Sequence, residues 1–269
     1  MTLGENTRLA MLEQRKIVEA EFHDVLRDPA LQEKPELYAK LTSNRKWYSV
    51  ARKSQEFARE YLRQHSRGGK ALDYACGDGN CSFVMAESGA DVIGIDISDT
   101  SVQNAGREAA RRGLSARFQV MDCEAMTFPD RSFDLINVNG VLHHMDLNHA
   151  YPELARVLKP TGSVLCAEAL AHNPVFQTYR KLTPHLRTEF ETEHILRRRD
   201  ILAARKYFNR VEWHFFHLVS LAAVPLRNSR LFEPALSLLE KVDSALLSVS
   251  PVRWWAWQIG FVLSDPKLK

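Results

Sequence analysis

The chain has 269 residues, of which 45% are hydrophobic and 26% charged, a composition typical of a globular protein with a sizeable core. Its formal net charge of +3 comes from 36 basic and 33 acidic residues mixed along the chain, which gives no reason to expect a nucleic-acid partner. Charged residues interrupt the first 20 positions and every longer apolar stretch, so we expect neither a signal peptide nor a transmembrane helix.

The cysteines do not form a recognisable set. There are four of them, Cys76, Cys81, Cys123 and Cys166. None belongs to a CxxC pair or has a histidine at the spacing of a zinc site, so we expect neither disulfides nor a bound metal. Such a pattern favours the reducing cytoplasm.

Residues 1–66 are predicted to form a helical N-terminal cap. Apolar residues recur at helical spacing near Ile17 and over 57–62. Pro29 and Pro35 interrupt this pattern and indicate breaks between helices. Aromatic residues at such spacing more often belong to a core, but three of them are candidates for a lid over a bound ligand: Tyr38, Trp47 and Tyr48.

Strands and helices alternate over residues 67–170. The predicted strands are 71–75, 91–97, 116–121, 133–138 and 163–167, and the predicted helices are 82–87, 99–112 and 150–158. Ser98 or Asp99 caps the second helix and Gly113 ends it. Such alternation predicts βαβ units in a doubly wound parallel sheet of the α/β class.

Residues 171–269 give a mixed pattern. We expect a strand over 210–216, a helix over 231–247 and a final strand over 257–263. Ordinary core is the default interpretation of the apolar stretches 215–226 and 254–257. They could also line a lipophilic pocket, contact a membrane surface or bury a homodimer interface.

The most informative stretch is a glycine turn led by an acid, Leu72-Asp73-Tyr74-Ala75-Cys76-Gly77-Asp78-Gly79-Asn80. Gly77 and Gly79 let the backbone approach a ligand closely. Asp73 and Asp96 belong to two successive strands and lie at the edge where ligands bind in open α/β sheets. A dinucleotide-binding turn would have a third glycine and no such acid beside a phosphate. The turn therefore favours a nucleoside with a free ribose diol and a cationic tail.

These motifs, together with 128–136 and 154–163, resemble the class I S-adenosylmethionine-dependent methyltransferases that act on small molecules. The resemblance covers residues 70 to about 170 and rests on five elements in the right order and spacing. It implies a Rossmann-like, doubly wound, seven-stranded sheet with helical additions at both ends. It also implies S-adenosylmethionine as cofactor and S-adenosylhomocysteine as product, with residues 171–269 covering the acceptor and completing the sheet.

The resemblance assigns the cofactor contacts residue by residue. The methionine end falls to Asp73, Gly77 and Gly79, with Ala75 at a position where the family more often has glycine. Asp96 would hold the ribose hydroxyls, with Ile97 beside the adenine. Asp122 would lie near the adenine amine, with Cys123 following it, and Asn139 would lie beside the sulfonium.

The loop after the fourth predicted strand, Asn139-Gly140-Val141-Leu142-His143-His144-Met145-Asp146, carries the candidate catalytic residues. Histidine suits the removal of a hydroxyl proton at neutral pH, although methyl transfer needs mainly positioning. The resemblance places His143, His144 and Glu168 beside the acceptor. We favour His143 as the base and give His144 a packing or capping role. The prediction is O-methylation of a small organic acceptor, of lipophilic or natural-product type.

Several alternatives stay open at this stage. Nitrogen or carbon could be methylated instead of oxygen, and the rival classes are an NAD-dependent oxidoreductase and a non-catalytic Rossmann-like binding module. Over 182–194 a charged cluster could contact a polar acceptor or form a solvated helix: His185, Arg187, Glu193 and His194. The run Arg197-Arg198-Arg199 is expected to be an exposed face.

Overall fold

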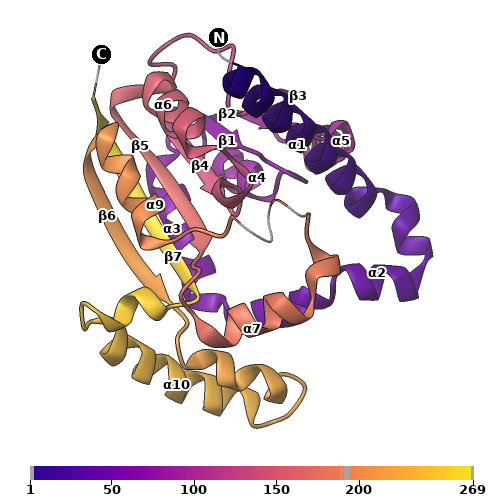
Figure 1. Cartoon of the computed structure of the whole chain (residues 1–269), viewed down its shortest axis with the longest axis vertical. Helices are drawn as coiled ribbons and strands as arrows, with labels where there is room; N and C mark the ends of the chain where they lie inside the picture. The colour runs from indigo at the N-terminus through magenta and orange to yellow at the C-terminus, as the bar shows by residue number, and fades with distance from the viewer. Residues whose placement is uncertain (1–2, 189, 191–193, 268–269) are drawn as a thin grey trace.

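The computed structural model describes residues 3–188, 190 and 194–267, and one sheet lies at its centre (Figure 1). Within these residues the sheet has seven strands in the order β3-β2-β1-β4-β5-β7-β6. The strands are β1 (Lys70–Tyr74), β2 (Asp91–Asp96), β3 (Ala116–Val120), β4 (Phe133–Asn139), β5 (Leu158–Ala169), β6 (Phe208–Phe216) and β7 (Gln258–Pro266). Only β7 is antiparallel to its neighbours, β5 and β6. The predicted seven-stranded, doubly wound fold is confirmed.

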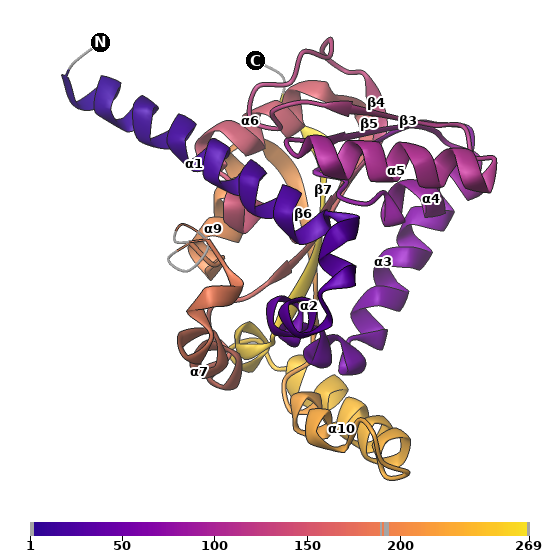
Figure 2. The ribbon, with the colours of Figure 1, turned by 90° about the vertical axis from the view of Figure 1, so that its right-hand side faces the viewer.

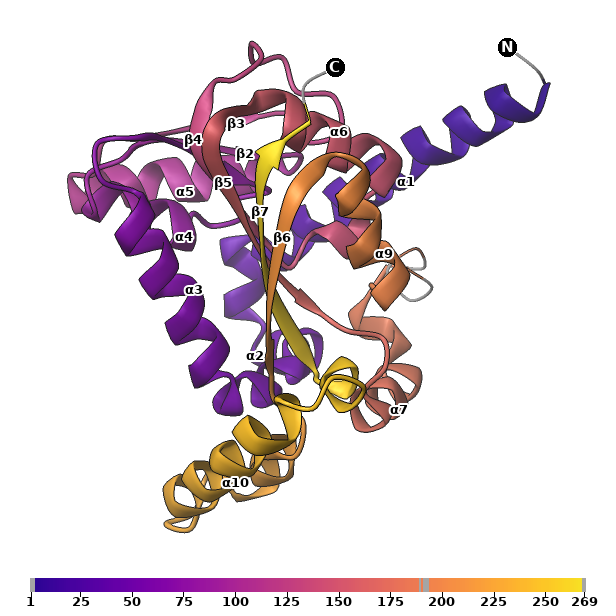
Figure 3. The same ribbon diagram turned by 90° about the vertical axis from the view of Figure 1, so that its left-hand side faces the viewer.

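Helices cover both faces of the sheet, as Figures 2 and 3 show from opposite sides. One face carries α3 (Arg52–His65), α4 (Asn80–Glu87) and α5 (Asp99–Arg112), and the other carries α6 (Leu147–Val157) and α9 (Arg198–Ala203). Successive residues of β1 alternate between the two layers. Ala71 packs in the cluster that contains Leu62 of α3, whereas Leu72 packs in the cluster that contains Leu154 of α6. This period of two is the reason why both faces need helices.

The strand order reverses at β1. From β1 the chain moves outward through β2 to β3, and it then returns to β4 on the other side of β1. In open α/β sheets such a reversal leaves a crevice at the carboxyl ends of the strands, where ligands bind. The crevice between β1 and β4 therefore defines where the site lies.

The turn signal at 159–162 is the place where the expected boundaries fail most. Helix α6 ends at Val157, one residue before its predicted end, and β5 begins directly at Leu158 instead of at residue 163. Leu158 pairs with Phe133 of β4, and the register then shifts before Ser163 pairs with Leu135. Pairing with β4 therefore overrides the local preference of the Pro-Thr-Gly sequence for a turn.

Segments from both ends of the chain form a cap beyond the carboxyl ends of the strands. Its hydrophobic cluster joins η2 (Ser43–Val50), α7 (Pro174–Leu182), η6 (Ser220–Leu226) and α10 (Phe232–Leu247). Trp257, directly before β7, packs in the same cluster. The remaining short helices are η1 (Pro29–Glu33), α2 (Pro35–Leu41), η3 (Leu142–His144), η4 (Pro184–Leu186), η5 (Ala204–Lys206) and η7 (Val252–Trp255).

Helix α1 (Leu3–Arg27) lies across the edge of the sheet that carries the crevice (Figure 2). Polar side chains tether it there: Arg15 Nη2 lies 2.6 Å from Glu124 Oε1, and Ser98 Oγ donates to Asp24 Oδ1 at 2.6 Å. Helix α1 is thus a lid fixed by side-chain contacts.

Over the described part of the chain, no helix is both long and apolar enough to cross a membrane.

Candidate active site

The glycine turn follows β1 and depends on three residues with left-handed backbone. These are Ala75 (φ 55°), Gly77 (φ 52°) and Gly79 (φ 81°). A Cβ on Gly79 would lie 2.8 Å from the Phe83 ring, so only glycine fits there. The side chain of Ala75 fits in size, but its positive φ costs about 1 kcal/mol. Alanine at this position therefore costs conformational free energy of the backbone and causes no steric clash.

A first cavity lies beside this turn, and most of the predicted cofactor residues line it. They are Ala75, Asp96, Ile97, Asp122, Cys123 and Asn139. Asp96 is buried, and its carboxylate accepts the backbone N–H groups of Gly77 at 2.8 Å and Ser98 at 2.9 Å. These two bonds tie the glycine turn to the end of β2 and hold the acid in place.

Asp73 takes a different place from the other acids. Its carboxylate accepts hydrogen bonds from Ser82 Oγ at 2.6 Å and from Asn137 Nδ2 at 2.7 Å. Burial raises the pKa of Asp73 to about 6 and outweighs the hydrogen bonds from Ser82 and Asn137. Among the described residues around the cavity, neither Asp73 nor the two glycines of the turn form its lining. Their contact with a cofactor stays a prediction, and Asp73 here connects β1 to α4 and β4.

The lid contributes cavity residues that the sequence reasoning missed. Four side chains of α1 at four-residue intervals face the cavity: Arg15, Glu19, His23 and Arg27. Lys16 joins them, and its Nζ lies 2.7 Å from Asp122 Oδ2. Polar residues repeated every four positions mark one face of a helix. This four-residue repeat of polar side chains is the sequence signal by which these cavity residues could be found.

Arg27 lies over the glycine turn. Its Nη1 donates to Ser101 Oγ at 2.8 Å, and its Nε lies 3.6 Å from Asp78 Oδ2. A Cβ on Gly77 would be only 2.8 Å from Arg27 Nη2. Absence of a side chain at Gly77 therefore lets a guanidinium reach the turn.

A second cavity of about 420 Å³ adjoins the first, a size within the range of about 300–1,000 Å³ common for small-molecule sites. Both cavities are lined by His23, Arg27, Asn139, Gly140 and His144. Aromatic residues of the cap and of the neighbouring elements form much of the rest of the wall: Phe22, Trp47, Tyr48, Phe57, Phe176, Phe216 and Trp257. The loop after β4 is therefore the partition between the two spaces.

His143 and Glu168 form a hydrogen-bonded pair on the wall of the second cavity. His143 Nδ1 lies 2.8 Å from Glu168 Oε2. Glu168 is 3% exposed, and its Oε1 accepts the backbone N–H groups of Val141 at 2.8 Å and Leu142 at 2.7 Å. One buried carboxylate thus fixes both the loop and the ring, and with Nδ1 donating to it the neutral ring has its lone pair on Nε2.

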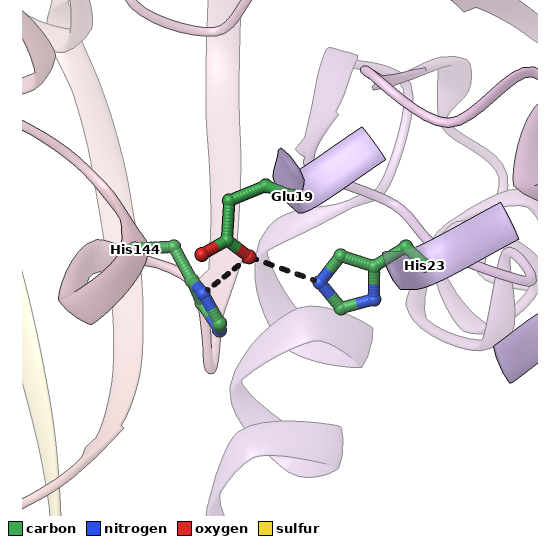
Figure 4. Close-up of side chains that lie close together, drawn as sticks. All are labelled: Glu19, His23 and His144. Atoms are coloured by element: carbon green, nitrogen blue, oxygen red, sulfur yellow. Dashed lines mark ion pairs between the residues drawn. The ribbon is translucent and has the colours of Figure 1, made fainter. Parts of the chain in front are cut away.

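His144 turns toward the lid instead. Its Nδ1 lies 3.0 Å from Glu19 Oε2 (Figure 4). Its ring centroid is 4.2 Å from that of His143. The adjacent histidines therefore contact different carboxylates, one on β5 and one on α1.

The other predicted contacts are dispersed. Trp47, Tyr48 and Arg187 line the second cavity rather than the first, while Tyr38 is half-buried and is outside the described lining of both. His185 is exposed, and His194 stacks on Phe190 beside a different cavity. Glu193 lies outside the described residues. The run 197–199 is exposed, as predicted.

Comparison with known proteins agrees with this geometry. Residues 72–166 match the family described as "Methyltransferase domain". Residues 72–166 therefore carry a methyltransferase domain, and the sheet that contains them has the class I fold that the resemblance implied.

Particular relatives share this domain. An uncharacterized protein of Mycobacterium tuberculosis is 37% identical over 36% of each chain. Phosphoethanolamine N-methyltransferase of Triticum aestivum is 38% identical over 38% of this chain and 20% of its own. Geranyl diphosphate C-methyltransferase of Streptomyces coelicolor shares the fold, with a TM-score of 0.55 at 17% identity over 78% of this chain and 79% of its own. The chain thus matches only about a third or less of the length of these two curated relatives.

Proposed function

We propose that this chain transfers the methyl group of S-adenosylmethionine to an oxygen of a small organic acceptor and releases S-adenosylhomocysteine. The first cavity would hold the cofactor and the second the acceptor. The proposal is supported by the shared wall of the two cavities, because methyl transfer is an in-line displacement that requires donor and acceptor side by side.

The residues of the first cavity suit the parts of this cofactor. Asp96 would accept both ribose hydroxyls, Ile97 and Cys123 would contact the adenine, and Asp122 would accept its amine. Arg27 supplies a cation over the glycine turn, where the carboxylate of the methionine part needs one. A bound cofactor of this kind supplies an electrophilic methyl group on sulfur.

The pair of His143 and Glu168 carries the assignment of oxygen as the methylated atom. His143 Nε2 would take the proton of the acceptor hydroxyl while the new O–C bond forms and the S–C bond breaks. Glu168 holds the ring through Nδ1 at 2.8 Å and stabilises the imidazolium that results. An oxygen nucleophile gains the most from this arrangement, since a hydroxyl is a poor nucleophile until it loses its proton.

The wall of the second cavity indicates the class of acceptor. Its aromatic side chains favour a flat or lipophilic body, and Arg180 and Arg187 at the same cavity favour a polar or anionic group on it. We therefore propose an aromatic or otherwise lipophilic hydroxyl compound. Methylation of an amine is the second candidate, because the wheat relative is named an N-methyltransferase.

The cofactor part of the proposal is tested by calorimetry with S-adenosylhomocysteine. Asp96→Ala should weaken binding about 30-fold or more, because hydrogen bonds to a buried carboxylate are lost. The matched control is Asp91→Ala, at the exposed opposite end of the same strand. Equal affinity of wild type and Asp96→Ala would contradict the assignment.

The acceptor part is tested with labelled S-adenosylmethionine and paired hydroxyl and amine compounds on matched aromatic bodies. His143→Ala should lower turnover of the hydroxyl compounds about 100-fold or more. S-adenosylhomocysteine affinity should change by less than about threefold, because His143 lines only the second cavity. Methylation of amines alone, with no dependence on His143, would replace oxygen by nitrogen.

A further inference from the structure

Three side chains from the lid and the loop form a cluster apart from the His143 pair. Glu19, His23 and His144 each offer one possible metal-ligating atom, and these atoms lie within 4.8 Å of one another. Glu19 Oε2 is 3.0 Å from His144 Nδ1 and 3.8 Å from His23 Nε2. Figure 4 shows the carboxylate between the two imidazole rings.

These distances are close to those of a metal site. Bonds of about 2.1 Å in tetrahedral geometry set neighbouring ligand atoms about 3.4 Å apart. The separations of 3.0 and 3.8 Å lie on either side of that value. The third separation, between the ligating nitrogens of the two histidines, is at most 4.8 Å.

The backbone and a further hydrogen bond orient the ligands. Glu19 and His23 are one turn apart on α1, so both face the same side of the helix. Thr188 Oγ1 donates to Glu19 Oε1, which leaves Oε2 toward the histidines. Such outer partners that orient a ligating carboxylate are typical of metal sites.

We propose that Glu19, His23 and His144 bind one divalent transition ion of the Zn²⁺ type on the wall shared by the two cavities. Two imidazoles and one carboxylate suit Zn²⁺, Fe²⁺ or Co²⁺ and not Mg²⁺ or Ca²⁺, which take oxygen ligands. The ion would join α1 to the loop after β4 and so hold the lid closed. Three protein ligands leave a position open to a group in either cavity.

The test is metal binding by the whole chain, prepared without a polyhistidine tag and freed of metal with a chelator. Zn²⁺ is titrated against a competing indicator, and bound metal is counted by mass spectrometry. Wild type should bind one equivalent. Glu19→Gln, His23→Ala and His144→Ala should each weaken binding at least about tenfold. Co²⁺ should give visible absorption bands of a low-coordinate nitrogen and oxygen site in wild type, and Glu19→Gln should abolish them.

The control variant is His149→Ala, a half-exposed histidine on α6 outside both cavities. It should bind Zn²⁺ as wild type does, and circular dichroism verifies that every variant is folded. Absence of Zn²⁺ binding by wild type, or equal binding by the folded cluster variants, would overturn the proposal. Loss of binding in His149→Ala would do so too, because the ion would then lie on the surface.

The site does not depend on the proposed methyl transfer, since the measurement involves no turnover. S-adenosylhomocysteine affinity of the wild type is measured in parallel. Cofactor binding without Zn²⁺ binding overturns the metal site alone, whereas Zn²⁺ binding without cofactor binding supports the metal site and contradicts the proposed function.

Discussion

His143 Nδ1 lies 2.8 Å from Oε2 of Glu168, a buried carboxylate whose other oxygen accepts two backbone N–H groups of the loop that carries this histidine. The ring that faces the second cavity is therefore oriented from β5, not by its own loop. Since Nδ1 donates to Glu168, the lone pair of the neutral ring is on Nε2.

Glu168→Gln tests this relationship with little change of volume. The amide oxygen can still accept from the loop backbone, but its NH₂ group would face His143 Nδ1 and force the other tautomer. The proton would then be on Nε2, and the base would be lost. We expect turnover to fall about 10²- to 10⁴-fold in single-turnover assays, with affinity for S-adenosylhomocysteine changed less than about threefold. Glu56→Gln, on the exposed side of α3, is the control. A parallel loss of cofactor affinity would mean that Glu168 acts through the loop alone.

Asp73 should make the free energy of unfolding depend on pH. Its pKa of about 6 in the folded chain exceeds the ordinary 3.8, so the folded state keeps a proton that the unfolded state has already released. Stability from this group is therefore present below about pH 4 and is lost as the pH rises to about 6. The difference is at most about 3 kcal/mol.

Asp73→Asn should remove that dependence. Asn137 can still donate to the amide oxygen, and the Ser82 hydroxyl can rotate to accept. Urea unfolding at pH 4.5 and pH 7 measures the effect, and the variant should gain stability relative to wild type at the higher pH. The same pH dependence in both proteins would assign it to other groups.

Ala75→Gly should be tolerated and mildly stabilising. Glycine removes the cost of a left-handed alanine, about 1 kcal/mol, and returns part of it as backbone entropy of the unfolded chain. The free energy of unfolding should rise by up to about 1 kcal/mol in urea titrations. Ala71→Gly in β1, which is buried strand backbone, should instead destabilise the chain. Destabilisation by both changes would contradict the backbone argument.

The sheet and its acids could be predicted from the sequence because their signals are local. Short apolar runs separated by turn residues define β1 to β5, and the carboxyl end of a strand fixes where Asp96 and Asp122 lie. The start of β5 at Leu158 could not be predicted, because pairing with β4 decides it. The cap could not be predicted either, because Val50 and Leu236 belong to one hydrophobic cluster only in the folded chain.

The lid shows the same limit within the site. The spacing of Arg15, Glu19, His23 and Arg27 marks a polar helix face, but no local signal states which part of the fold that face covers. Likewise, the spacing of cysteines and histidines along the sequence predicts no metal site, whereas the proposed ligands combine one turn of α1 with a distant loop. Contacts between elements far apart in sequence are set by packing.

Arg27 offers the sharpest test of the cofactor's orientation. If its guanidinium binds the carboxylate of the methionine part, Arg27→Gln should weaken S-adenosylhomocysteine binding by about 1.5–3 kcal/mol, roughly 10- to 100-fold. Methylthioadenosine has the same nucleoside but no carboxylate, so its affinity should stay within about threefold of wild type. Arg107→Gln on the exposed side of α5 is the control. Equal losses for both ligands in calorimetry would place Arg27 in the closure of the lid rather than at the carboxylate, because closure affects every ligand beneath α1.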